Sequence, residues 1–268
     1  EIDRVFVVFS PGQIDDTIVG AMIEFAETHG SFVVLDTDAD LTPSQAVAYA
    51  DGLSATSHAA VYYPHLWVPD STSRSRDSII KIPPSGSVAG LFLATDAAFG
   101  VFKSPAGLNT VVPGVVAMER SLTNENLDAL NNDTRPVNAI RVVPGSGPVV
   151  MGARTLDQSK ATKYVNVRRT MTYLSKEMES LTGFALFRNN DNNLWREMSA
   201  VLDNFLRGFF VDGGLRGNST ADAYYIKIDA ENNTPSDVAA GVVNVEVGVS
   251  LQYPAEFIKI QLTQRTIA

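Results

Sequence analysis

The sequence predicts an α/β (α+β) protein, and two patterns carry that prediction. Near the N-terminus, short apolar runs typical of buried strands alternate with amphipathic helical segments in a β-α-β-α-β order. This order indicates a parallel or mixed sheet with right-handed crossovers. Toward the C-terminus, helical segments are followed by stretches in which apolar and polar residues alternate, which predicts helices and then a β-rich unit.

The N-terminal pattern contains three predicted strands and two predicted helices. The strands are residues 5–9, 32–36 and 59–63. Asp15 is expected to cap the first helix, which ends at Gly30. Its predicted buried face consists of Ile18, Met22, Phe25 and Ala26. The second helix starts at an N-cap Thr42 that is followed by proline.

The middle of the chain is rich in Pro, Gly, Ser and Asn. We expect a loop over residues 64–84, a helix from Ser85, and one short helix at residues 124–130. Residues 145–150, "GSGPVV", are predicted to form a turn-rich linker. A domain boundary is placed there, which divides the chain into units 1–150 and 151–268.

The C-terminal unit begins with two predicted helices, residues 164–181 and 191–210. The second carries the clearest apolar stripe of the chain, made of Leu194, Met198, Val201, Leu202, Phe205 and Phe209. Three alternating segments predict strands at residues 223–229, 241–251 and 255–264. Acids and amides in residues 229–237 are expected to form a solvated turn.

A basic cluster stands out because the chain of 268 residues has a formal net charge of −9. Residues 152–174 hold one acid, Asp157, and five cations: Arg154, Lys160, Lys163, Arg168 and Arg169. Arg154, Lys163, Arg168 and Arg169 are candidates for an interface with a neighbouring acidic surface, and the arginines suit it because a planar guanidinium can bind a carboxylate through two hydrogen bonds. Internal ion pairs are an equally open alternative.

The last predicted strand is a second candidate interface. Phe257, Lys259 and Gln261 would share one of its faces. An edge strand of this kind can pair with another chain, although an ordinary strand within a sheet explains the pattern as well.

Composition and motifs argue against most other classes of function. The chain has no cysteine, and its three histidines lack metal-ligand spacing, so no catalytic, cofactor or metal residue is predicted. The acidic balance argues against nucleic-acid binding, and no apolar run approaches the roughly 18 residues of a membrane helix. An enzymatic or small-ligand-binding α/β domain stays open as an alternative, as does a non-contractile virion scaffold protein.

A series of short stretches, taken together and in order, resembles the tail sheath proteins of contractile bacteriophages and related contractile injection devices. They are residues 82–107, "GARTL" at 152–156, "YVNVRR" at 164–169, "LW" at 194–195, "FL" at 205–206, "GGLRG" at 213–217, "NNTP" at 232–235 and "PAEFIKIQ" at 254–261. None of these stretches carries a catalytic group.

The resemblance implies a structural subunit that is not an enzyme. Such subunits self-associate into stacked rings around a tail tube protein, and the cylinder contracts to drive the tube into a target envelope. The implied location is the virion tail, assembled in the host cytoplasm, with no direct membrane insertion by the sheath. Sheath subunits also carry terminal arms that donate strands to neighbours; because the chain begins at Glu1 without one, the resemblance predicts a fragment.

Overall fold

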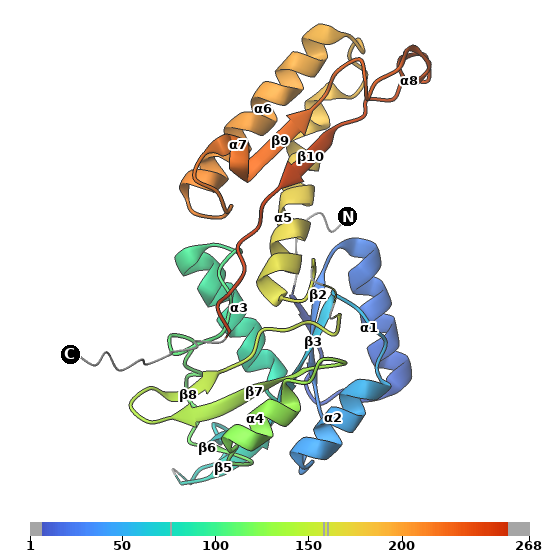
Figure 1. The fold of residues 1–268 in the computed structure, drawn as a ribbon. Coiled ribbons are helices and arrows are strands. Elements are labelled where there is room, and N and C mark those ends of the chain that lie inside the picture. The colour runs from blue at the N-terminus through green and yellow to red at the C-terminus, as the bar shows by residue number, and fades with distance from the viewer. Residues whose placement is uncertain (1–6, 76, 158, 160, 257–268) are drawn as a thin grey trace, which may run out of the picture.

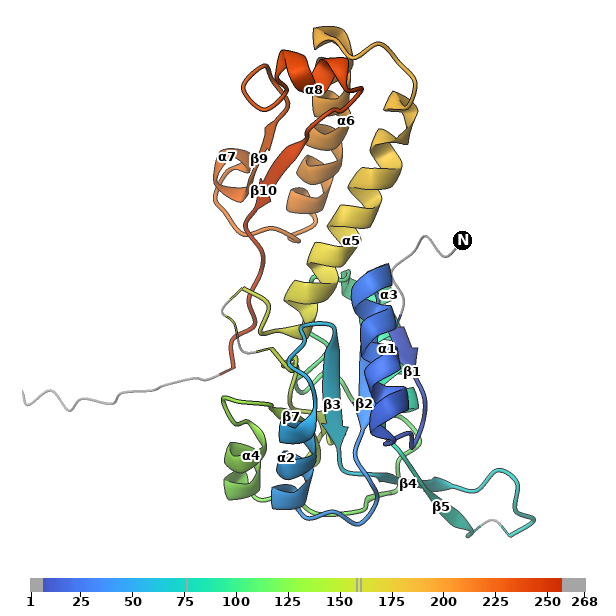
Figure 2. The ribbon, with the colours of Figure 1, turned by 90° about the vertical axis from the view of Figure 1, so that its right-hand side faces the viewer.

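The computed structural model describes residues 7–75, 77–157, 159 and 161–256 of the chain. It has two lobes: a lower lobe built around a central sheet, and an upper lobe of two long helices beside a hairpin (Figures 1 and 2). The mixed helix-and-sheet architecture predicted from the sequence is confirmed.

The central sheet of the lower lobe has five strands in the order β1-β2-β3-β7-β8. Their bounds are β1 Val7–Phe9, β2 Phe32–Asp36, β3 Ala59–Tyr63, β7 Val137–Val143 and β8 Gly147–Val150. The first four run parallel, and β8 pairs antiparallel with β7. The predicted strands at 32–36 and 59–63 are therefore confirmed. Both of their faces are covered, so every residue of β2 and β3 is buried, and all but Asp36 at the end of β2 are apolar or aromatic.

Helices cover both faces of this sheet. On one face lie α1 (Asp16–His29), α2 (Pro43–Gly52) and α4 (Asn124–Leu130); on the other lies α3 (Ser85–Phe99). Asp15 caps α1 by accepting hydrogen bonds from two backbone amides, and Gly30 ends it in the left-handed conformation. Thr42 and Gln45 form a capping box at the start of α2. These predicted helix starts and the end at Gly30 are confirmed.

The predicted buried face of α1 is right for Ala26 and Met22, which pack on the core, and wrong for Ile18 and Phe25. The residues that pack on the sheet are Val19, Ile23 and Ala26, whereas Ile18 and Phe25 are 45% and 36% exposed. The helix has apolar residues on two adjacent faces, and periodicity alone does not decide between them. One of these apolar faces is therefore left uncovered within the described part of the chain.

Residues 145–150 do not form a linker. They complete a hairpin between β7 and β8, in which Gly145 and Gly147 take positive φ angles of 84° and 89°. Residues 64–84 are likewise more than a loop, since β4 (Leu66–Pro69) and β5 (Ile79–Ile82) join β6 (Ala117–Met118) in a small antiparallel sheet. The division of the chain after residue 150 stays a prediction.

The upper lobe is built on two long helices, α5 (Val165–Thr182) and α6 (Asn192–Val211), joined through the short 3₁₀ turn η1 (Gly183–Ala185). The chain then forms α7 (Thr220–Ala223), β9 (Tyr224–Lys227), α8 (Pro235–Ala239) and β10 (Glu246–Val249). The strands β9 and β10 pair antiparallel beside α6 (Figure 2). The predicted solvated turn is in part α8, which starts at a capping box of Thr234 and Asp237.

Helix α5 belongs to the cores of both lobes. Its first residue, Val165, packs with Phe92 of α3 and Ile140 of β7 in the lower lobe. Further along the same helix, Leu174 packs with Leu206 in the core of the upper lobe. One continuous helix thus connects the two hydrophobic cores.

Candidate assembly surfaces

The basic cluster lies where the two lobes meet, and two of its arginines are buried in ion pairs within the chain. Arg169 of α5 donates two hydrogen bonds, of 2.9 and 2.5 Å, to the carboxylate of Asp96 on α3. Its guanidinium carbon also lies 4.9 Å from the ring centroid of Phe92. With only 3% of Arg169 exposed, this pair fastens α5 to α3.

Arg154 makes the second internal pair. Its Nε and Nη2 donate to Glu256 at 2.6 and 2.7 Å, and the Tyr164 hydroxyl donates to the same carboxylate at 3.0 Å. The segment that carries Arg154 is held by Asn138 of β7, whose side chain bonds the Arg154 amide and carbonyl. A side chain at Gly152 would meet Asn138 at 2.7 Å, so this close approach requires glycine.

The Arg154–Glu256 pair makes stability depend on pH. Burial raises the pKa of Glu256, but the hydrogen bonds and charge of Arg154 outweigh it and hold that pKa below its ordinary value of 4.5. A carboxylate of this kind contributes stability above its ordinary pKa and loses it as pH falls through the lower pKa of the folded state.

Replacing Glu256 by glutamine is therefore expected to lower the free energy of unfolding at neutral pH. The difference between the variant and the unsubstituted protein should shrink as the pH falls below 4.5, because Glu256 is protonated first in the unfolded state and then, at lower pH, in the folded state. Urea unfolding at a series of pH values measures both effects. A constant difference across the series would contradict the assignment.

The other two described cations of the cluster are less enclosed. Burial lowers the pKa of Arg168, and the negative charge of Asp157 opposes that shift. The Nζ atom of Lys163 lies 5.7 Å from the centroid of the Tyr164 ring. Arg168 and Lys163 thus stay candidates for contact with a neighbour, as the sequence suggested. Phe257, Lys259 and Gln261 lie outside the described residues, and their predicted interface stays a prediction.

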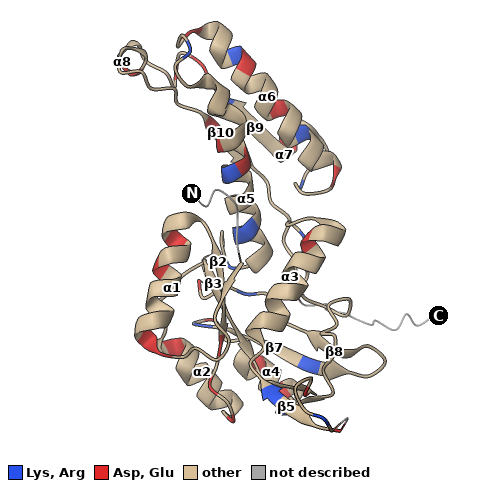
Figure 3. Cartoon of the chain, turned by 180° about the vertical axis from the view of Figure 1, so that it is seen from behind, with Lys and Arg blue, Asp and Glu red and all other residues tan. Residues whose placement is uncertain are grey.

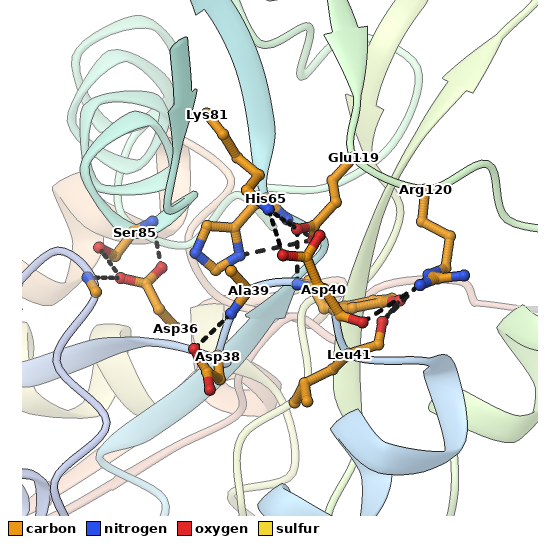
Figure 4. A network of polar contacts seen from close by, with 12 residues as sticks. Asp36, Asp38, Ala39, Asp40, Leu41, His65, Lys81, Ser85, Glu119 and Arg120 are labelled. Carbon is orange, nitrogen blue, oxygen red and sulfur yellow. Dashed lines mark hydrogen bonds and ion pairs between the residues drawn. The ribbon is translucent and has the colours of Figure 1, made fainter.

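A polar network at the carboxyl end of β2 was not found from the sequence (Figure 4). Asp36, the last residue of β2, accepts hydrogen bonds from the backbone amide and hydroxyl of Ser85 at 2.7 and 2.6 Å and from the Gly12 amide at 2.9 Å. Helix α3 begins at Ser85 and has no capping side chain of its own. Asp36 therefore serves as a cap from a distant strand, and its burial raises its pKa.

The second part of this network joins β4, β5 and the segment after β6 to the loop that follows β2. The Nζ atom of Lys81 on β5 lies 2.8 Å from a carboxylate oxygen of Asp40 and 3.0 Å from one of Glu119. Glu119 also accepts hydrogen bonds from the backbone amides of Asp40 and His65 (Figure 4). Ligands often bind at this end of a parallel sheet. Here the polar groups bond one another, so the network stabilises the packing of the three-stranded sheet against the five-stranded sheet.

Among the residues that the structure describes, no group of three or more His, Cys, Asp or Glu side chains is placed to hold a metal ion. Within that same part of the chain, no helix is both long enough and apolar enough to cross a bilayer.

Residues 3–156 match the phage tail sheath protein central domain, and residues 157–265 match the phage tail sheath C-terminal domain. The chain therefore belongs to the phage tail sheath family. The resemblance drawn from the short sequence stretches is thereby confirmed.

Individual relatives agree with the family. A putative prophage major tail sheath protein of Pseudomonas aeruginosa (strain UCBPP-PA14) is 26% identical over 230 residues, which cover 79% of this chain and 56% of that protein. The chain therefore spans little more than half the length of this relative.

Two solved assemblies are similar in structure. The sheath complex of an extracellular contractile injection system, PVC, in its contracted state is 31% identical, with a TM-score of 0.86 over 98% of this chain and 72% of that chain. The contracted helical sheath of the anti-feeding prophage is 27% identical, with a TM-score of 0.81 over 98% of this chain and 71% of that one.

Proposed function

We propose that this chain forms part of the subunit of a contractile tail sheath, and that copies of the whole subunit polymerise into a helical cylinder. The observation that carries the proposal is the similarity, over 98% of the chain, to a sheath complex solved in its contracted state. The two-lobed architecture supports the proposal. Ion pairs and the continuous helix α5 connect the lobes, so that the subunit can contact neighbours on several sides.

The tail tube protein is the proposed second partner. A sheath that contracts around a rigid tube converts energy stored in the extended assembly into movement, so the subunit itself needs no catalytic site. The filled polar network at the end of β2 supports this non-enzymatic role, because its carboxylates are occupied by partners from neighbouring elements. The proposed location is the tail of a phage-like particle, assembled in the host cytoplasm.

The full-length protein that contains this chain is expected to form long hollow cylinders. Negative-stain imaging of the purified protein, alone and co-expressed with the tube protein of the same gene cluster, tests polymerisation and the tube partner separately. Cylinders that shorten and widen on exposure to mild denaturant would support a contractile sheath. Cylinders of fixed length and width would favour a non-contractile scaffold, and a monomer under both conditions would contradict the proposal.

A further inference from the structure

The chain segment that builds one flank of the lower lobe carries negative charge and no lysine or arginine. Residues 5–73 contain no lysine and no arginine, and from Val7 onward they build β1, α1, β2, α2 and β3. Their exposed acids include Glu24 and Glu27 on α1 and Asp51 on α2. In the view from behind, α1 and α2 carry acidic residues, drawn red, and no lysine or arginine, drawn blue (Figure 3).

The same flank exposes an apolar stripe. Ile18 and Phe25 stand seven residues apart on α1, which places them on one side of the helix. These are the apolar side chains that α1 does not use against the sheet. Glu24 lies beside Phe25 and is exposed as well, so the stripe has an acidic rim.

Along the β7–β8 hairpin, the opposite flank carries exposed apolar side chains and cations, while two exposed acids, Glu125 and Asp128, lie on the neighbouring α4. Residues 97–118 and 134–156 contain no aspartate and no glutamate. They build the β7–β8 hairpin and a loop that runs along its outer edge, where the Val112 amide donates to the Pro148 carbonyl at 2.8 Å. Leu108 and Val142 are 57% and 54% exposed there.

Three cations of this second flank have no ion pair. Lys103, Arg135 and Arg141 form none with any residue that the structure describes. Arg135 donates to the backbone carbonyls of Leu53 and Thr134. Arg141 donates only to the amide oxygen of Asn124, at 3.1 Å. Arg154, by contrast, is buried and paired with Glu256. The basic charge available to a partner therefore lies on or just before β7 and in the segment after α3, and not at the centre of the basic cluster.

The sheet order places these two flanks at opposite ends of one sheet. β1 and β8 are its terminal strands, and α1 packs over the β1–β2 end (Figure 1). The flanks cannot meet within one chain. Each flank has exposed apolar side chains with charged residues around them, and the two flanks carry opposite charge. Protein–protein interfaces have the same arrangement, an apolar core within a polar rim of complementary charge. Two different patches on one subunit produce a heterologous contact, which propagates into a ring or helix.

We propose that the acidic flank, centred on Ile18 and Phe25 of α1, binds the basic flank, centred on Leu108 and Val142, of a second copy of this chain. The contact deepens the proposed sheath function and rests on it, because it is a lateral contact between subunits of one assembly. Charge complementarity selects the second copy over a nucleic acid, which the acidic flank would repel.

Site-specific cross-linking in assembled particles of the full-length protein tests this contact. Cysteines replace Ile18 and Val142 in one variant, or Ile18 and Leu108 in another; all three positions are exposed. The 268 residues contain no native cysteine, and any cysteine elsewhere in the full-length protein is replaced by serine. A bifunctional thiol reagent should produce a ladder of covalent oligomers from at least one of these pairs. The control pair, Ile18→Cys with Ile79→Cys on the β4–β5 hairpin, should give at least tenfold less.

The outcomes separate the inference from the proposed function. Particles that assemble but give no ladder from either test pair, or an equal ladder from the control pair, overturn the contact and leave the sheath function standing. If the unsubstituted protein forms no particles, the proposed function fails instead, and with it the basis of the contact. A thermal melt of each variant before assembly shows that the exposed substitutions leave the fold intact.

Discussion

Replacing Asp96 by alanine is expected to lower the free energy of unfolding by about 3–5 kcal/mol, the usual cost of leaving one member of a buried ion pair uncompensated. The substitution leaves the guanidinium of Arg169 without a negatively charged partner. This group is almost fully buried against Phe92 and has no other carboxylate partner among the described residues. Denaturant unfolding of the purified protein measures the change.

The matched control for this prediction is Glu197→Ala. Glu197 pairs with Arg188 at 2.8 Å, but both side chains are close to half exposed. Such surface pairs contribute about 0.2–1 kcal/mol. If the two substitutions had equal effects, Arg169 would have to be solvated, and the pair would not be what fastens α5 to α3.

Replacing Leu202 by alanine is the second substitution with a large expected effect, about 2–5 kcal/mol in the free energy of unfolding. Leu202 lies in the middle of α6 and is fully buried. Truncation removes apolar contacts and leaves a cavity between α6 and its neighbours, which relax only partly. The shift of the urea midpoint at constant slope gives the loss.

Val211 provides the control for Leu202, because it is the last residue of α6 and points largely to solvent. Val211→Ala should change the free energy of unfolding by less than about 0.5 kcal/mol, the usual surface range. An effect of Leu202→Ala within that range would place the apolar stripe of α6 outside the core.

The stripe on α6 shows what periodicity can predict. Leu194, Met198 and Leu202 are buried as expected, because residues three and four apart share a helix face. The edges of the face were less accurate: Trp195 and Leu206 are buried, whereas Val201, Phe205 and Phe209 are half-buried. Which side of a stripe is covered depends on the neighbouring elements, and their position is not encoded locally.

The partners of the basic cluster could not be predicted for a related reason. Asp96 lies 73 residues from Arg169, and Glu256 lies 102 residues from Arg154. Each pair forms only because the fold brings two distant elements together. The sequence left internal pairing and an interface equally open, and for these two arginines the structure supplies internal partners.

The missed β7–β8 hairpin has another physical origin. Its turn residues Pro144, Gly145 and Gly147 made the stretch resemble a linker, although turn residues of this kind also connect antiparallel strands. The tertiary cap of Asp36 on α3 is equally invisible in the sequence, because capping motifs are recognised only when the capping side chain is adjacent to the helix.

The continuous helix α5 has a mechanical consequence. With 18 residues it is about 27 Å long, and no loop interrupts it between the two cores that it enters. A force applied to the upper lobe is transmitted along the hydrogen-bonded backbone of α5. The Asp96–Arg169 pair opposes bending of this helix near its N-terminal end. Such a subunit is stiff along that direction, so a cylinder built from it would change length through sliding between copies while each copy keeps its shape.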